Sequence, residues 1–363
     1  MKVAIIAGAR PNFIKISPIL TEIKKHKNLQ PILINTGQHY DFEMSKIFFD
    51  NLEIINPHYN LEVGSGSNGQ QTGRALISIE EVLIKEKPDL VIVVGDVNST
   101  LAGSLAAVKL HIPVAHVEAG LRSCDQRMPE EINRILTDHI ATYLFTSEPS
   151  AALNLKNEGI LSSKIFFVGN VMIDSLINNK KKIDKSPVLK KLSLQEKKYI
   201  VLTLHRQENV DDKAIFGQIL SAIKEISDSY KIVWPMHPRT KNKIKEFNFD
   251  KFLEKIDIIE PLGYIDMIAL IKNAKAVLTD SGGIQEETTF LKIPCLTLRN
   301  STERPITEQI GTNKVIGINK KDIFREVKIL SNKNFIVKGK IPKFWDGKAS
   351  ERIVKKIVTI SKK

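Results

Sequence analysis

The pattern that most constrains the fold is the alternation of short apolar runs, rich in valine and isoleucine, with longer segments of helical periodicity. This alternation predicts strand–helix–strand units and a parallel sheet. The pattern fades in the lysine-rich segment 180–198 and then starts again. The strands predicted before that segment are 3–7, 31–35, 90–94, 114–117, 143–146 and 165–168. Those predicted after it are 200–204, 231–234, 256–259, 276–279 and 295–298.

The repeat of this pattern predicts an α/β protein with two Rossmann-like, doubly wound domains, which is reasonable for 363 residues. We place the first domain at residues 1–170 and the second at 171–348. Ligands of open parallel sheets bind outside the carboxyl ends of the strands. Charged and small residues gather at those ends in both halves, which predicts a cleft between two facing domains.

Composition excludes several classes of function. The net charge of +13 comes mostly from scattered lysines, which favours small anionic substrates over nucleic acid. The sequence has no signal peptide pattern and no apolar run near the roughly 20 residues of a membrane span, so we predict a cytoplasmic protein without a membrane partner. Cys124 and Cys295 are too isolated to indicate a disulfide framework or a zinc site.

The segment GSGSNG at 64–69 has the spacing of a dinucleotide-binding fingerprint. Such a fingerprint needs a firm strand before it, whereas residues 57–63 are polar and irregular. We therefore interpret it as a glycine-rich loop that enters a helix at about Gln71, and predict no nicotinamide cofactor.

The segment TDSGGIQEE at 279–287 follows a predicted buried strand and opens a helix. Backbone N–H groups at a helix N-terminus bind phosphate, and Ser281, Gly282 and Gly283 leave these groups uncovered. The alternative is a simple N-cap by Asp280 or Ser281. Glu287 could accept hydrogen bonds from ribose hydroxyls, or it could be a solvated residue on the helix surface. Together these residues indicate a nucleoside diphosphate site.

Cationic side chains follow other predicted strands. Arg10 ends the first strand and could bind phosphate or form a surface ion pair. His205, Arg206 and His237 follow the first two strands of the second half. A single histidine at such a place is often structural, but the cluster favours anion binding and acid–base chemistry.

Carboxylates follow two neighbouring strands of the first half. Asp96 and Glu118 are costly at buried strand ends unless they are solvated, paired or functional, and a low-dielectric site could raise one pKa for proton transfer. Glu130 and Glu131 follow a proline and could simply complement a helix dipole. From their spacing, Arg122 and Arg134 are expected to hold carboxylates in place.

Several motifs occur together in one order between residues 8 and 306: GARPNFIKISPI, GDVNST, HVEAGLRS, PEEINR, GNVMIDSL, TLHRQEN, TDSGGIQEE and ERPI. In this set the chain resembles the non-hydrolysing UDP-N-acetylglucosamine 2-epimerases along nearly its full length. The resemblance implies a glycosyltransferase-B type fold, a homodimer, and neither a metal nor another cofactor. It also implies that residues 349–363 form a helix that packs back on the first domain.

The resemblance implies reversible epimerisation at carbon 2 of UDP-N-acetylglucosamine, for surface polysaccharide precursors. UDP is eliminated to give 2-acetamidoglucal and then added back. The catalytic residues implied by motif are Asp96, Glu118, Glu130 and His205. The substrate-binding residues that we predict from motif and position are Arg10, Lys15, Arg206, His237, Leu262, Met267, Ser281, Gly282, Gly283, Glu287 and Arg304.

One departure concerns regulation. Some bacterial members are activated by a second substrate molecule near a TGQH-like loop and an arginine that precedes Gln-Thr. Gln38 and His39 are present here, but Gln70 replaces that arginine, so we do not predict this activation. The alternatives are the same reaction on another UDP-2-acetamido sugar, a glycosyltransferase of this fold, and a UDP-sugar binding protein without activity. Hydrolysing relatives carry other residues in place of HVEAGLR and PEEINR.

Overall fold

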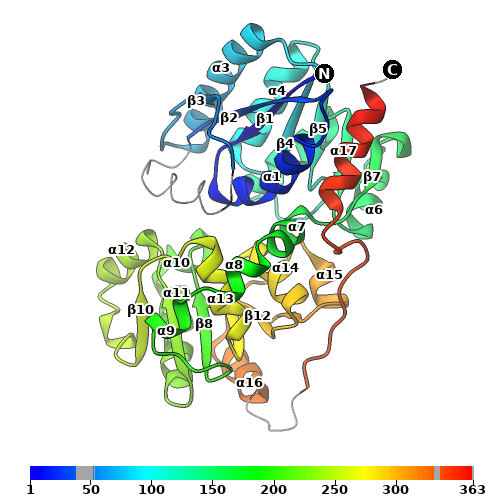
Figure 1. The fold of residues 1–363 in the computed structure, drawn as a ribbon. Coiled ribbons are helices and arrows are strands. Elements are labelled where there is room, and N and C mark those ends of the chain that lie inside the picture. The colour runs from blue at the N-terminus through cyan, green and yellow to red at the C-terminus, as the bar shows by residue number, and fades with distance from the viewer. Residues whose placement is uncertain (38–51, 53, 331–335, 362–363) are drawn as a thin grey trace. The chain divides into compact units, whose positions relative to one another are not determined.

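The computed structural model describes residues 1–37, 52, 54–330 and 336–361. The chain divides into two compact units (Figure 1). The first unit comprises Met1–Asn178 together with Lys343–Lys363, and the second comprises Asn179–Pro342. Within the described ranges, no helix is long and apolar enough to cross a membrane. Gln38 and His39 lie outside the described residues.

The first unit contains one parallel sheet with the strand order β3-β2-β1-β4-β5-β6-β7. Every strand predicted in this half is present, and the short strand β3 adds an edge that the sequence pattern did not indicate. The strands are β1 (Lys2–Ala7), β2 (Gln30–Asn35), β3 (Tyr59–Asn60), β4 (Leu90–Val94), β5 (Val114–Val117), β6 (Tyr143–Thr146) and β7 (Ile165–Phe167).

Helices connect these strands, as parallel pairing requires. They are α1 (Arg10–Ile23), α3 (Asn68–Glu86), α4 (Asn98–Lys109), α5 (Pro129–Ile140), α6 (Pro149–Asn157), η1 (Ser162–Lys164), α7 (Val171–Asn178) and α17 (Ala349–Ile360). Helix α3 starts at Asn68, before the predicted Gln71, because Ser67 forms a capping box with Gln70. The glycine-rich segment is thus partly the loop and partly the first turn of this helix.

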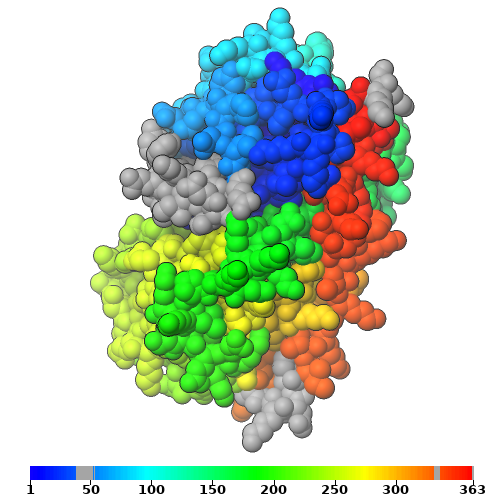
Figure 2. Space-filling view, in the orientation of Figure 1, coloured from blue at the N-terminus to red at the C-terminus, as the bar shows by residue number. Residues whose placement is uncertain are grey.

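The central strands of this sheet are almost entirely apolar, with His116 of β5 the exception in β4 and β5, because helices cover both faces. Every residue of β4 and β5 is buried. Helix α17 packs on α1 and α7, and Figure 2 shows the red C-terminal segment against the blue N-terminal part of the same unit. The buried Asp174 of α7 accepts hydrogen bonds from the backbone N–H groups of Ala349 and Ser350, and so caps α17.

The second unit contains a parallel sheet with the order β10-β9-β8-β11-β12-β13. The strands are β8 (Tyr199–Thr203), β9 (Lys231–Pro235), β10 (Ile256–Ile259), β11 (Ala276–Thr279), β12 (Cys295–Thr297) and β13 (Asn313–Val315). The last of these was not predicted, because its three residues are too short for a periodic signal. A separate hydrophobic core includes Phe216, Trp234 and Leu278. The predicted α/β class with two doubly wound domains is confirmed.

The helices of the second unit are mostly the crossovers between its strands. They are α8 (Lys180–Asp184), α9 (Val188–Lys191), α10 (Gln207–Val210), α11 (Lys213–Ser227), α12 (Pro238–Phe247), η2 (Asp250–Phe252), α13 (Tyr264–Asn273), α14 (Gly282–Leu291), α15 (Pro305–Gln309) and α16 (Lys320–Leu330). The lysine-rich segment, which had no clean period, thus contains the short helices α8 and α9.

Candidate functional site

Asp96 and Glu118 lie at neighbouring strand ends in the first unit. Strand β4 pairs with β5 in parallel, with Val94 opposite Val117, so the segments that follow both strands leave the sheet at the same edge. The hydrogen bond of 3.0 Å from the Gly95 N–H to the Val117 carbonyl continues this pairing beyond β4. The structure therefore brings the two carboxylate-bearing turns together, as their positions in the sequence predicted.

Glu118 is buried and has an unusual backbone conformation. Its φ of 71° lies in the left-handed region, which non-glycine residues seldom adopt and which is enriched at functional sites. Its N–H donates to the Phe145 carbonyl at 3.0 Å. The Lys15 ammonium, also buried, lies 2.6 Å from the Glu118 carboxylate, so this buried charge is paired.

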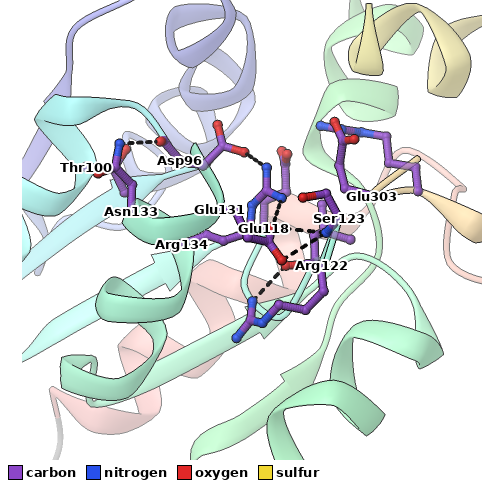
Figure 3. A network of polar contacts seen from close by, with 12 residues as sticks. Asp96, Thr100, Glu118, Arg122, Ser123, Glu131, Asn133, Arg134 and Glu303 are labelled. Carbon is purple, nitrogen blue, oxygen red and sulfur yellow. Dashed lines mark hydrogen bonds and ion pairs between the residues drawn. The ribbon is translucent and has the colours of Figure 1, made fainter. Parts of the chain in front are cut away.

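Arg134 of α5 links two carboxylates (Figure 3). Its guanidinium donates to Asp96 and to Glu131, as the spacing of these residues predicted. Glu131 in turn accepts hydrogen bonds from the Ser123 N–H and the Cys124 N–H at 2.9–3.1 Å. The fully buried Glu131 is therefore committed to holding the loop between β5 and α5.

Asn133 of the same helix fixes the backbone around Asp96. Its amide nitrogen donates to the Asp96 carbonyl at 2.9 Å and to the Asn98 side chain at 3.1 Å. Asn98 does not cap α4, because the N-cap of that helix is Val97.

Glu130 lies in the first turn of α5 and is partly exposed, which suits either contact with a ligand or interaction with the helix dipole. Arg10 is exposed at the start of α1.

In the second unit, Asp280 organises the end of β8. Its Oδ1 lies 3.0 Å from His205 Nδ1, and its Oδ2 accepts from the backbone N–H groups of His205 and Arg206 at 2.9 Å each. Burial by itself raises the pKa of the Asp280 carboxyl, but the charge and hydrogen bonds of His205 and the Arg206 N–H outweigh burial and lower it. Because Nδ1 faces Asp280, the imidazole can exchange a proton through Nε2.

The N-terminus of α14 is open, as a phosphate site requires. Ser281 is the N-cap residue, but its side chain makes no capping hydrogen bond, and Asp280 faces β8 instead. A Cβ atom on Gly282 would lie 2.4 Å from the Arg304 guanidinium and 2.7 Å from the Glu303 carboxylate, so any other residue there must displace these side chains. Arg304 is held by Glu286 and Glu303, and its guanidinium lies beside Gly282 in the first turn of the helix. Gly283 is the next residue of the helix.

The remaining predicted residues lie around this edge of the second sheet. Glu287 is buried, so the interpretation as a solvated helix residue is wrong. Burial, together with the charge and hydrogen bond of Glu287, raises the pKa of Tyr264 well above its ordinary value. Leu262 and Met267 flank Tyr264 and are partly buried.

His237 and Arg206 have defined structural contacts. His237 is the N-cap of α12 and accepts a hydrogen bond from the Arg239 N–H at 3.2 Å. Its ring centroid lies 6.3 Å from that of His205. Arg206 Nε donates to the Asp280 carbonyl at 2.9 Å. The structure thus brings the two histidines and Arg206 together at the ends of β8 and β9.

Sequence reasoning missed the supporting residues. It gave Asp280 only a capping role, regarded Glu131 as a helix-dipole residue, and attributed no function to Asn133. The sequence did contain a signal for these supporting residues. In a helix such as α5, residues three or four positions apart lie on one face, so polar residues at that spacing indicate a polar network toward the sheet. Among the residues that the structure describes, no group of three histidine, cysteine or acidic side chains could hold a metal ion.

Comparison with known proteins adds the family to this geometry. The family model for UDP-N-acetylglucosamine 2-epimerase matches residues 21–358. A UDP-N-acetylglucosamine 2-epimerase homolog of Methanococcus maripaludis is 54% identical over 90% of this chain and 92% of its own. The UDP-2,3-diacetamido-2,3-dideoxy-D-glucuronate 2-epimerase of Pseudomonas aeruginosa is 44% identical over 97% of this chain and 98% of its own.

A solved structure agrees with the whole fold. The crystal structure of Methanocaldococcus jannaschii UDP-GlcNAc 2-epimerase in complex with UDP-GlcNAc and UDP has a TM-score of 0.93 and 50% sequence identity. The match covers 99% of this chain and 100% of that one. With its two doubly wound sheets and a match of this extent, the chain belongs to the UDP-N-acetylglucosamine 2-epimerase family.

Proposed function

We propose that the protein interconverts UDP-N-acetylglucosamine and UDP-N-acetylmannosamine by inverting carbon 2 of the sugar. The observation that carries this proposal is the pair of carboxylates at adjacent strand ends, Asp96 and Glu118, each bound to a buried cation, Arg134 and Lys15. Carboxylates held at one edge of a sheet suit proton removal from one face of a carbon and proton return to the other. Family membership supplies the substrate class.

The chemistry proceeds by elimination, because the hydrogen on carbon 2 of an N-acetylamino sugar is not acidic. A carboxylate takes that proton, the electrons of the C–H bond form the double bond of 2-acetamidoglucal, and the bond from carbon 1 to UDP breaks. UDP then adds back to carbon 1 while carbon 2 receives a proton on its opposite face. We assign the proton transfers to Asp96, Glu118 and Glu130, and assistance of the leaving diphosphate to His205.

The second unit is the proposed UDP site. Helix α14 begins with Gly282 and Gly283, and the guanidinium of Arg304 lies beside Gly282, so a diphosphate at this helix N-terminus would meet both backbone N–H donors and a cation. We add Ser281, Arg206 and His237 for the phosphates, Glu287 for the ribose, and Leu262 and Met267 for the uracil. Arg10 and Lys15 are the proposed contacts from the first unit. Lys15 also pairs with Glu118, so substrate would compete for its ammonium.

Incubation of the protein with UDP-N-acetylglucosamine in deuterated water, followed by NMR, tests this proposal. The expected result is UDP-N-acetylmannosamine with deuterium at carbon 2. Free N-acetylmannosamine and UDP would instead indicate hydrolysis, and an unlabelled, unchanged substrate would contradict epimerisation of this sugar. Asp96→Asn and Glu118→Gln should each lower turnover by at least about 100-fold and still bind UDP. Glu351→Gln, an exposed residue of α17, is the matched control.

The diacetamido sugar is a second candidate substrate. The relative from Pseudomonas aeruginosa, whose name specifies UDP-2,3-diacetamido-2,3-dideoxy-D-glucuronate, is 44% identical to this chain, compared with 54% for the relative from Methanococcus maripaludis. The two substrates differ at carbons 3 and 6, so the ratio of kcat/KM values measured on both in the same assay decides between them. A ratio that favours the diacetamido uronate would replace the first proposal without changing the reaction.

We further propose that the protein is a homodimer through the surface of α3 and α5. Ile77 and Ile84 of α3 and Ile132 and Leu136 of α5 are 47–58% exposed, and α4 packs between these helices. Such a patch is typical of an interface. Light scattering should give twice the chain mass of 40.9 kDa. Ile132→Lys should give the monomer, unlike the control Leu161→Lys, and a monomeric wild-type protein would contradict the proposal.

A cytoplasmic location stays a prediction from the sequence.

A further inference from the structure

His116 is the one histidine among the described residues that lies entirely inside the first unit. It occupies β5, two residues before Glu118, and its side chain has no exposed surface. Nδ1 lies 2.7 Å from Asp138 Oδ1, and Nε2 lies 2.8 Å from the Gly95 carbonyl oxygen. Asp138, on α5, is equally buried. No step of the proposed reaction uses either residue.

Both nitrogens of the His116 ring face acceptors. A carbonyl oxygen cannot donate, so Nε2 must carry a hydrogen. Asp138 Oδ2 accepts from the Gly120 N–H at 3.0 Å and from the Arg122 guanidinium at 2.7 Å, which is the pattern of an ionised carboxylate. Burial raises the pKa of the Asp138 carboxyl, but His116 and Arg122 together lower it more. Nδ1 faces this carboxylate, so the ring bridges Asp138 and the Gly95 carbonyl through both of its nitrogens.

The atoms that this pair holds belong to the two turns that carry the proposed catalytic carboxylates. Gly95, whose carbonyl accepts from His116, directly precedes Asp96, and Gly120, whose N–H donates to Asp138, is two residues after Glu118. Gly95, Glu118 and Gly120 all have φ between 71° and 81°, so both turns depart from the extended strand conformation. A hydrogen-bonded pair that spans both turns fixes their separation more tightly than apolar packing does.

We propose that His116 and Asp138 form a positioning pair that sets the placement of Asp96 and Glu118 for proton transfer. This inference rests on the proposed function, because it assumes that those two carboxylates react. The pair touches neither carboxylate and acts through the backbone of Gly95 and Gly120. A buried pair of this kind is weak evidence of stabilisation in itself, since desolvation of both groups offsets their attraction. Geometric control of the turns explains why the sequence places one here.

The plainest alternative is that His116 and Asp138 contribute to stability alone. Steady-state kinetics of variants distinguishes this structural role from the positioning role. His116→Gln keeps a donor of similar size but loses the ring that bridges Asp138 and the Gly95 carbonyl. We expect kcat for epimerisation and the rate of deuterium entry at carbon 2 to fall about 100-fold, because displacement of a reacting group by about 1 Å costs that much. KM and the Kd for UDP should stay within about twofold. Asp138→Asn should show the same split between kcat and KM.

His26→Gln is the matched control, because His26 lies in the same unit, outside the proposed dimer surface, and its side chain is 34% exposed. It should keep wild-type kcat. Thermal unfolding of each variant identifies any loss of fold. If folded His116→Gln and Asp138→Asn both keep wild-type kcat, or if KM rises in proportion to any fall in kcat, the positioning role is wrong.

A measurement on the wild-type protein avoids the folding of variants. In a spectrum that correlates ring nitrogens with carbon-bound ring protons, Nε2 of His116 should carry a hydrogen, because it faces the Gly95 carbonyl oxygen, whereas an unprotonated Nε2 would overturn the inference. Asp96→Asn and Glu118→Gln separate this outcome from failure of the proposed function. If they are inactive while His116→Gln is fully active, only the positioning pair fails. If they are fully active, the proposed catalytic roles fail and the inference fails with them.

Discussion

Asp280 shows how one buried side chain determines what another can do. The carboxylate accepts hydrogen bonds from two consecutive backbone N–H groups and also faces His205 Nδ1. These contacts fix the turn after β8 and the tautomer of the imidazole at once. A carboxylate that orients a histidine in this way stabilises the imidazolium when the other nitrogen takes a proton. We infer that His205 depends on Asp280 for its proposed role toward the leaving diphosphate.

Asp280→Asn tests this dependence. The amide has nearly the same shape, but its NH₂ group cannot accept hydrogen bonds, so the imidazole loses its fixed tautomer. We expect kcat to fall by about 100-fold or more, with the Kd for UDP changed much less. Steady-state kinetics measures kcat, and calorimetric titration measures the Kd for UDP. Asp228→Asn, an exposed residue of the same unit, should change neither. Equal losses of kcat and UDP affinity would indicate instead that the turn has collapsed.

Helices α5 and α14 both begin near strand ends, yet their first turns do different things. In α5, Glu131 faces back onto the Ser123 and Cys124 N–H groups, and Arg134 bridges it to Asp96. In α14 the first turn has no capping side chain, and Gly282 leaves space for the Arg304 guanidinium. The first helix is therefore built to hold neighbouring loops, and the second to leave its N–H groups available for an anion.

Gly282→Ala should weaken UDP binding. The new methyl group would lie 2.4 Å from the guanidinium nitrogen of Arg304, so the arginine must move away from the helix N-terminus. One charge-assisted hydrogen bond is worth about 1.5–3 kcal/mol, and we expect the Kd for UDP to rise by about 10–100-fold. Gly73→Ala is the control, because a Cβ atom there meets nothing within 4 Å and alanine is favoured in a helix. An unchanged Kd for Gly282→Ala would remove Arg304 and this helix end from the UDP site.

At the scale of the whole molecule, each unit has its own parallel sheet, its own core and its own buried aspartate of lowered pKa. Asp138 belongs to the first unit and Asp280 to the second. In each case burial alone would raise the pKa, and a histidine and neighbouring donors reverse the direction. A carboxyl whose pKa is lower in the folded state contributes stability above its unfolded pKa of 3.8, and that contribution is lost as the pH falls through the folded value.

We therefore expect the free energy of unfolding to fall steeply below about pH 4, by up to about 1.4 kcal/mol per pH unit for each of these carboxyls. Urea unfolding followed between pH 6 and pH 3 measures the slope. Asp280→Asn should flatten it, whereas the exposed Asp228→Asn should leave it nearly unchanged. The same slope in Asp280→Asn as in the wild-type protein would show that Asp280 does not have a lowered pKa.

The glycosyltransferase-B type fold class and most of the strands could be predicted from the sequence. Each buried strand is a run of apolar residues, and the segment that connects it to the next strand has apolar residues at helical spacing. β13 could not, since three residues carry no period, and its pairing with β12 is decided by tertiary packing. Positions at strand ends predicted that Glu118 and His205 lie beside other charged residues, because topology alone brings the ends of parallel strands to one edge. The partners Lys15 and Asp280 were assigned other roles, because their contacts depend on side-chain direction and not on position along the chain.

The sequence by itself determined where strands end and which residue types are delivered there. That information is local, since apolar runs, glycines and capping residues act within a few positions of the chain. Only the tertiary structure decided which charges meet. Arg134 reaches Asp96 across 38 residues, and His205 reaches Asp280 across 75. Leaving a buried charge unpaired costs free energy. Such a charge therefore pairs with a group that the fold places within hydrogen-bond distance, and the sequence alone does not give that distance.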